Sequence, residues 1–114
     1  MTIPITASFV GGKGLDSQTV IPIYKESVIA GNSDAVDLKL SNRFMSRRHF
    51  QVHFETDVFY LSDLGSTNGT FVNDIRLESR QRLNSNDMVR VGWNEFRFVD
   101  EEENSLEKTA YILD

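Results

Sequence analysis

A short stretch near the middle of the sequence gathers arginines around two residues that often take part in chemistry. It contains Arg43, Arg47 and Arg48 together with Ser46 and His49. Guanidinium groups donate strong and often bidentate hydrogen bonds to anions, and a serine hydroxyl adds a further donor. Runs of charged residues are more often solvated loops. The combination of hydroxyl, loop amide and guanidinium donors nevertheless favours a site for an anion with several acceptor oxygens.

Ser46 and His49 also invite comparison with a hydrolase, but the other parts of such a centre are missing. No nucleophile elbow surrounds Ser46, and neither oxyanion donors nor an acid that orients His49 can be assigned. The sequence has two histidines and no cysteine, which excludes disulfides, thiolate catalysis and cysteine-ligated zinc. We therefore predict a non-catalytic domain without a cofactor or a metal site.

A second group of small polar residues follows a short way downstream. Ser66, Thr67 and Asn68 precede Gly69, and the chain then enters an apolar run. An asparagine amide both donates and accepts hydrogen bonds, so it can bind the main chain of an extended peptide. An anion site beside a peptide-binding group predicts recognition of a phosphopeptide.

Short strands are the elements that must position these two loops. Apolar residues alternate with polar ones at period two in three stretches: Phe50, Val52 and Phe54 against His49, Gln51 and His53; Phe59 and Leu61; Phe96 and Phe98. Further apolar runs occupy residues 5–10, 19–24, 28–30, 37–40, 70–72 and 88–91, with turn-forming residues between them. No window has a convincing helical period. The pattern predicts an all-β sandwich or barrel with functional loops at one end.

Length and charge restrict the kind of protein further. The chain has 114 residues and a formal net charge of −5, which fits one soluble domain and argues against nucleic acid or an anionic membrane as its partner. It has neither a signal peptide nor a stretch that could span a bilayer, so we expect a cytoplasmic location.

The alternation of apolar and polar residues ends in an acidic tail. We expect a domain over residues 1–100 and a linker over 101–114, with a short helix near 106–113, as the N-terminal regulatory part of a larger protein.

The motifs taken together resemble the forkhead-associated (FHA) domain family. The resemblance runs from Thr19 to Val99, with its pieces in family order: Gly31 at a strand end, SRRH at 46–49, GSTNGTFVN at 65–73 and RVGWNEFRF at 90–98. It implies a β-sandwich of about eleven strands in two sheets, whose loops at one end bind phosphothreonine.

The resemblance also implies roles for individual residues. Ser46 would donate its hydroxyl to the phosphate, and Arg47 would contribute its main-chain amide and its charge. Thr67 and Asn68 would lie against the peptide, with Asn68 bound to the backbone near the phosphothreonine. His49 would be a structural strut between loops, and Gly69 would take a left-handed turn conformation.

One position departs from the family pattern. Gly31 is followed by Asn32, where the family has an arginine that clamps the phosphate. Loss of one charged hydrogen bond, worth about 1.5–3 kcal/mol, lowers affinity by about one to two orders of magnitude. We expect Arg43 or Arg47 to compensate, whereas Asp34 would oppose phosphate if it faced the site.

Two hypotheses about function follow. The first is a binding module for a threonine-phosphorylated partner, or for a phosphorylated segment of its own protein. The alternative is a degenerate FHA-like domain that makes phosphate-independent protein contacts, which Asn32 favours. The sequence leaves the oligomeric state open.

Overall fold

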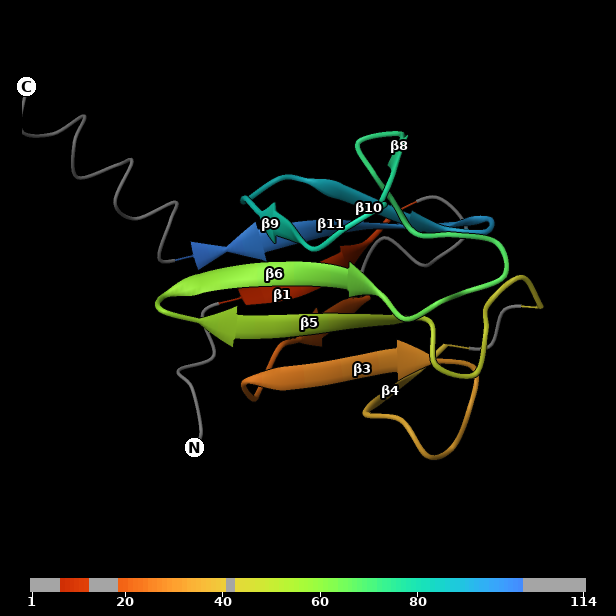
Figure 1. Ribbon diagram of the computed structural model, residues 1–114. Helices are drawn as coiled ribbons and strands as arrows, with labels where there is room; N and C mark the ends of the chain where they lie inside the picture. Colours follow the sequence, from red (N-terminus) through yellow and green to blue (C-terminus); the bar gives the residue numbers. More distant parts are fainter. Residues whose placement is uncertain (1–6, 13–18, 41–42, 102–114) are drawn as a thin grey trace, which may run out of the picture.

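Eleven short strands form two sheets that pack face to face in the computed structural model, which describes residues 7–12, 19–40 and 43–101 (Figure 1). One sheet has the strand order β2-β1-β11-β10-β7-β8, and the other has the order β4-β3-β5-β6-β9. The predicted all-β sandwich of eleven strands is confirmed. Within the described residues, no helix has the length and apolar character needed to cross a membrane.

The strand bounds are as follows. The six-stranded sheet contains β1 (Ala7–Gly11), β2 (Val20–Pro22), β7 (Phe71–Val72), β8 (Ile75–Arg76), β10 (Met88–Val91) and β11 (Asn94–Asp100). The five-stranded sheet contains β3 (Ser27–Gly31), β4 (Leu38–Lys39), β5 (Phe50–Glu55), β6 (Val58–Asp63) and β9 (Gln81–Leu83). The β3–β4 pair is parallel, whereas the other pairs are antiparallel.

The core lies between the sheets and is built from the inward residues of the alternating strands. The phenylalanine ring of Phe9 is at its centre, with ring centroids 6.0 Å from Phe50 and 5.8 Å from both Phe96 and Phe98. Such tilted and edge-to-face pairs add to the stability gained from burial alone. The alternation of apolar and polar residues in the sequence therefore predicts correctly which side chains of the main strands are buried.

Two details differ from the sequence pattern, and one expectation is not tested. The strands β8 and β9 match none of the predicted runs, because most of their residues are exposed and give little apolar signal. The alternation also groups His49 with Gln51 and His53, but His49 precedes β5 and its side chain is fully buried. The expected linker, apart from Glu101, and the expected helix near 106–113 lie outside the described residues.

The loops that carry the candidate residues gather at one end of the sandwich. Figure 1 shows the β3–β4, β4–β5 and β6–β7 connections together at the right, with the turn between β10 and β11 at the same end. Strands β3 and β6 run toward this end and β5 runs away from it. Antiparallel pairing of β5 with both neighbours therefore brings loops from distant parts of the sequence together.

Candidate functional site

The site begins where β3 ends, at a very close contact between two segments of main chain. A Cβ atom on Gly31 would lie 1.9 Å from the carbonyl oxygen of Arg47. The next residue extends the contact, because the amide of Asn32 donates to the carbonyl of Ser46 at 2.9 Å. Only a glycine allows this approach, so the residue type at position 31 fixes where Ser46 and Arg47 lie relative to Asn32.

His49 ties the β4–β5 loop to the β6–β7 loop. Its Nδ1 accepts the amide hydrogen of Ser46 at 3.0 Å, and its Nε2 lies 2.9 Å from the carbonyl oxygen of Gly69. Because Nδ1 accepts, the ring hydrogen is on Nε2, which donates to that carbonyl. The imidazole is fully buried and both of its nitrogens are used in holding main chain. This arrangement positions the loops and leaves no nitrogen of His49 for catalysis.

A second set of bonds joins the two loops at their exposed tips. The hydroxyl oxygen of Ser46 accepts the amide hydrogen of Thr67 at 3.1 Å, and the side-chain Nδ2 of Asn68 donates to the carbonyl of Phe44 at 2.9 Å. Because the Ser46 oxygen acts as an acceptor here, its own hydrogen is available to donate to an incoming anion. Thr67 and Asn68 are exposed, so a peptide that crosses the tips of the β4–β5 and β6–β7 loops can reach both. We call this exposed edge of the two loops the rim.

The carboxylate of Asp63, at the end of β6, stabilises the β6–β7 loop by accepting hydrogen bonds from it. Its two oxygens accept the amide of Ser66 at 2.8 Å, the hydroxyl of Ser66 at 2.5 Å and the hydroxyl of Thr70 at 2.7 Å. Burial raises the pKa of Asp63, but the hydrogen bonds from Ser66 and Thr70 hold the pKa below its ordinary value. The Ser66 oxygen in turn accepts the amide of Gly69, whose φ of +89° is left-handed. These hydrogen bonds hold the β6–β7 loop in one defined conformation.

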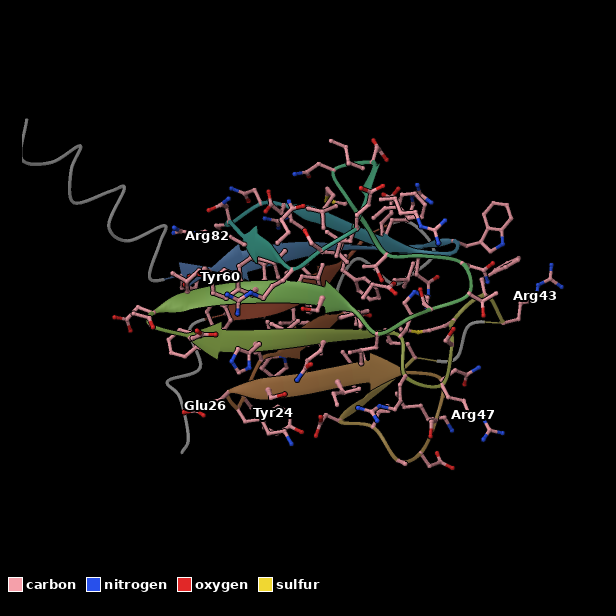
Figure 2. The ribbon with its side chains drawn as sticks, in the orientation of Figure 1. Tyr24, Glu26, Arg43, Arg47, Tyr60 and Arg82 are labelled. Carbon is pink, nitrogen blue, oxygen red and sulfur yellow. The ribbon has the colours of Figure 1, made fainter. Side chains whose placement is uncertain are left out.

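The arginines stand on two sides of this rim. Figure 2 shows Arg43 and Arg47 extending outward from the loop end in different directions. The Arg43 guanidinium lies over the Phe44 ring at 4.9 Å from its centroid. Arg47 and Arg48 line a groove of about 320 Å³ beside the β3–β4 loop. Within the described residues, Arg43 and Arg47 form no ion pair, so their charge is available to an anion.

Asp34 is the acidic residue that the sequence raised as an obstacle to phosphate. Its carboxylate accepts a hydrogen bond from Lys39 at 2.7 Å, and this bond holds the pKa of Asp34 below its ordinary value. The ammonium group offsets the negative charge locally. Asp37 is paired in the same way with Lys25 at 2.5 Å. Neither carboxylate is left as an isolated negative charge beside the arginines.

The structure thus brings Asn32, Ser46 and Arg47 together through main-chain contacts, and joins Ser46 to the Thr67–Asn68 segment. The Arg43 guanidinium lies over the Phe44 ring. Sequence reasoning gave no role to Asp63, although an Asp followed three residues later by Ser is a common loop-stabilising pattern. Among the described residues, no cluster of His, Cys, Asp and Glu could hold a metal ion.

Comparison with known proteins supports the same interpretation of the sequence. The FHA domain family model matches residues 28–92. The probable E3 ubiquitin-protein ligase dma1 of Schizosaccharomyces pombe is 31% identical over an alignment of 85 residues, and the match covers 66% of this chain and 31% of that protein. The FHA domain-containing protein FhaB of Mycobacterium tuberculosis is 31% identical over 72 residues, which is 63% of this chain and 46% of that protein. The chain spans less than half the length of these relatives.

Solved structures give the same result. The FHA domain from a structural and functional analysis of phosphothreonine-dependent FHA domain interactions has a TM-score of 0.73 at 28% identity, covering 82% of this chain and 94% of that one. Mycobacterium tuberculosis EmbR, in complex with a low-affinity phosphopeptide, has a TM-score of 0.76 at 26% identity, covering 82% of this chain and 24% of that one.

Proposed function

Because the chain belongs to the FHA domain family, we propose that its loop end binds peptides that contain phosphothreonine. The FHA domain is a non-catalytic binding module, and FHA homologues bind phosphothreonine peptides. No bond is made or broken in the proposed function. The peptide is held by hydrogen bonds and by the attraction between arginine and phosphate.

The observation that carries the proposal is the position of Ser46. Its oxygen already accepts from the Thr67 amide, which leaves its hydroxyl hydrogen available to an external acceptor. The guanidinium of the exposed neighbour Arg47 supplies positive charge without a carboxylate partner among the described residues. A phosphate monoester carries about −1.5 to −2 charges and three acceptor oxygens. Asn68, exposed on the facing loop, can bond to the peptide main chain through its side-chain oxygen and the Nδ2 hydrogen that is not used by Phe44.

Arg47 is the better substitute for the missing family arginine. The Arg47 main chain touches Gly31, which directly precedes Asn32, whereas the Arg43 guanidinium is over Phe44. We therefore propose that Arg47 provides most of the charge at the phosphate and that Arg43 contributes at longer range.

The second candidate function is a phosphate-independent protein contact, and the neutral Asn32 favours it. The domain would then keep the FHA fold but bind its partner without a phosphate. We also propose that the domain is the recognition part of a larger protein, since the matched region covers less than half the length of each of these two relatives.

The deciding experiment measures fluorescence anisotropy with a degenerate phosphothreonine peptide library and its unphosphorylated counterpart. We expect binding of the phosphorylated library alone, and about tenfold weaker binding by Ser46→Ala, the effect of one lost charged hydrogen bond. Ser79→Ala, at an exposed serine of the β8–β9 loop, is the control and should bind as the wild type does. Equal affinity for both libraries would support the phosphate-independent alternative.

The substitution Asn32→Arg tests the family departure directly. An arginine at this position adds a fork of donors toward the phosphate, so we expect about tenfold tighter binding that weakens as salt rises. The affinity for the unphosphorylated peptide should stay unchanged. If calorimetry shows no gain, repeating the substitution in an Arg43→Ala, Arg47→Ala background shows whether those arginines already fill the phosphate position.

A further inference from the structure

The single tryptophan of the chain is exposed at the same end of the sandwich as the proposed site. Trp93 lies in the turn between β10 and β11, and 63% of its surface is accessible. This turn lies beside the loop end in Figure 1. Tryptophan is a large side chain that normally contributes to a core or an interface, so one left this exposed contributes little to folding.

Trp93 is not isolated on this surface. Its ring packs against Phe44 in an edge-to-face arrangement, with centroids 5.8 Å apart and planes at 64°. The Arg43 guanidinium lies over Phe44 at 4.9 Å. These three residues, Arg43, Phe44 and Trp93, form a continuous surface that we call the aromatic platform.

The aromatic platform borders the proposed peptide site through a direct bond. The carbonyl of Phe44 accepts the hydrogen bond from the side chain of Asn68 at 2.9 Å. A peptide whose main chain is held by Asn68 therefore passes next to Phe44 and Trp93. Tryptophan and arginine are also the side chains most enriched among residues that dominate binding energy at interfaces.

We propose that the aromatic platform binds an aromatic side chain of the same peptide, close in sequence to its phosphothreonine. This inference rests on the proposed phosphothreonine binding and specifies which peptides the site selects. Ring–ring contact with Trp93 and Phe44, together with the Arg43 guanidinium facing a π system, favours an aromatic residue over a small or acidic one. The phosphate then contributes the same affinity to every phosphopeptide, and contact with the aromatic platform makes peptides with an aromatic residue bind more tightly than the others.

The test uses phosphothreonine peptides with a serine–alanine background. In each peptide one phenylalanine replaces one residue within about four positions of the phosphothreonine, a distance of about 13 Å in an extended chain. We expect one or two neighbouring positions at which phenylalanine tightens binding by about fivefold or more. The emission of Trp93 should change for those peptides, and it reports on this site alone because the chain has one tryptophan.

Two variants separate the aromatic platform from the phosphate site. Trp93→Ala should abolish the gain from phenylalanine but keep the affinity for the background phosphopeptide. Tyr24→Ala is the matched control, because Tyr24 is also an exposed aromatic residue, at 41%, and Figure 2 places it away from Arg43. This control should bind every peptide as the wild type does.

The outcomes are distinguishable. If no phosphopeptide binds, the proposed function and this inference are both wrong. If phosphopeptides bind but phenylalanine gives no gain at any position, or the gain survives Trp93→Ala, only the inference is wrong. Sedimentation that shows a dimer dissociated by Trp93→Ala, without any dependence on phenylalanine, would assign the surface to a second copy of the chain and also overturn the inference.

Discussion

Replacing Gly31 by alanine tests whether the contact between β3 and the β4–β5 loop positions the binding residues. The φ angle of Gly31 is not left-handed, so its backbone conformation suits any residue. At such a position Gly→Ala ordinarily stabilises a protein by about 0.4–1 kcal/mol, because the unfolded chain loses freedom. The surroundings of Gly31 predict the opposite sign.

The new Cβ atom would lie 1.9 Å from the carbonyl oxygen of Arg47 and 3.0 Å from that of Ser46. Cβ atoms essentially never come within 3.0 Å of an atom outside their own residue and its chain neighbours, so one of the two backbone segments must move. Overpacking of this kind costs about 1–3 kcal/mol. The movement also weakens the bond from Asn32 to Ser46, which is worth about 1 kcal/mol. Allowing for the entropy gain, we expect a net loss of about 2–3 kcal/mol.

The measurement is urea unfolding, with phosphopeptide titration at a temperature where the variant is folded. A loss of this size lowers the melting temperature by about 10 °C or more in a domain of this length. Because Ser46 and Arg47 move with the loop, affinity should fall about tenfold or more. Gly12→Ala is the comparison: its Cβ would lie 3.2 Å from the carbonyl oxygen of Glu95, a tight contact that a shift of a few tenths of an ångström relieves, so it should cost less stability than Gly31→Ala. A Gly31→Ala protein as stable as the wild type would show that this contact does not determine where the loop lies.

Three further predictions concern the groups that hold the site. His49→Ala should lower the free energy of unfolding by about 2–4 kcal/mol, since two buried hydrogen bonds are lost at about 1–2 kcal/mol each; a loss below about 1 kcal/mol in urea would contradict this role. The pKa of Asp63 is lowered by folding, so its stabilisation is present above the ordinary value of 3.8 and is lost as the pH falls through the lower folded pKa. The wild type should therefore lose more stability than Asp63→Asn below about pH 4, and parallel acid unfolding curves would refute this. Arg47→Ala should shift the melting temperature by only a few degrees but reduce the salt dependence of phosphopeptide binding, because exposed charges add little to stability. A large thermal loss would show that Arg47 is structural.

The fold was largely predictable from the sequence because it depends on a repeated local signal. Inward residues such as Phe50, Val52 and Leu61 recur at every second position, and burial of one sheet face requires that spacing. The strands β8 and β9 lack this signal, since pairing with a neighbouring strand defines them more than burial does. The parallel β3–β4 pair could not be predicted either, because periodicity carries no information about strand direction.

The site was predictable only in part. The motif residues Ser46, Thr67 and Asn68 were expected on two loops, and the structure joins those loops by the bond between Ser46 and Thr67. Asp63 and Trp93 received no role from the sequence. Asp63 holds its loop through hydrogen bonds that form only once the chain has folded, and Trp93 contacts Phe44, which is distant from it in the sequence. A local sequence pattern shows neither of these contacts.

The way in which the loops are held has a consequence for evolution. The groups that fix the loops, His49 and Asp63, bond mainly to main chain and small hydroxyls. The residues that we propose to contact a ligand, such as Asn32, Arg43 and Trp93, have exposed side chains. Substitutions on the rim can therefore accumulate without unfolding the domain. Descendants of one ancestral scaffold can exchange one ligand for another, or lose and regain phosphate recognition, through single residue changes.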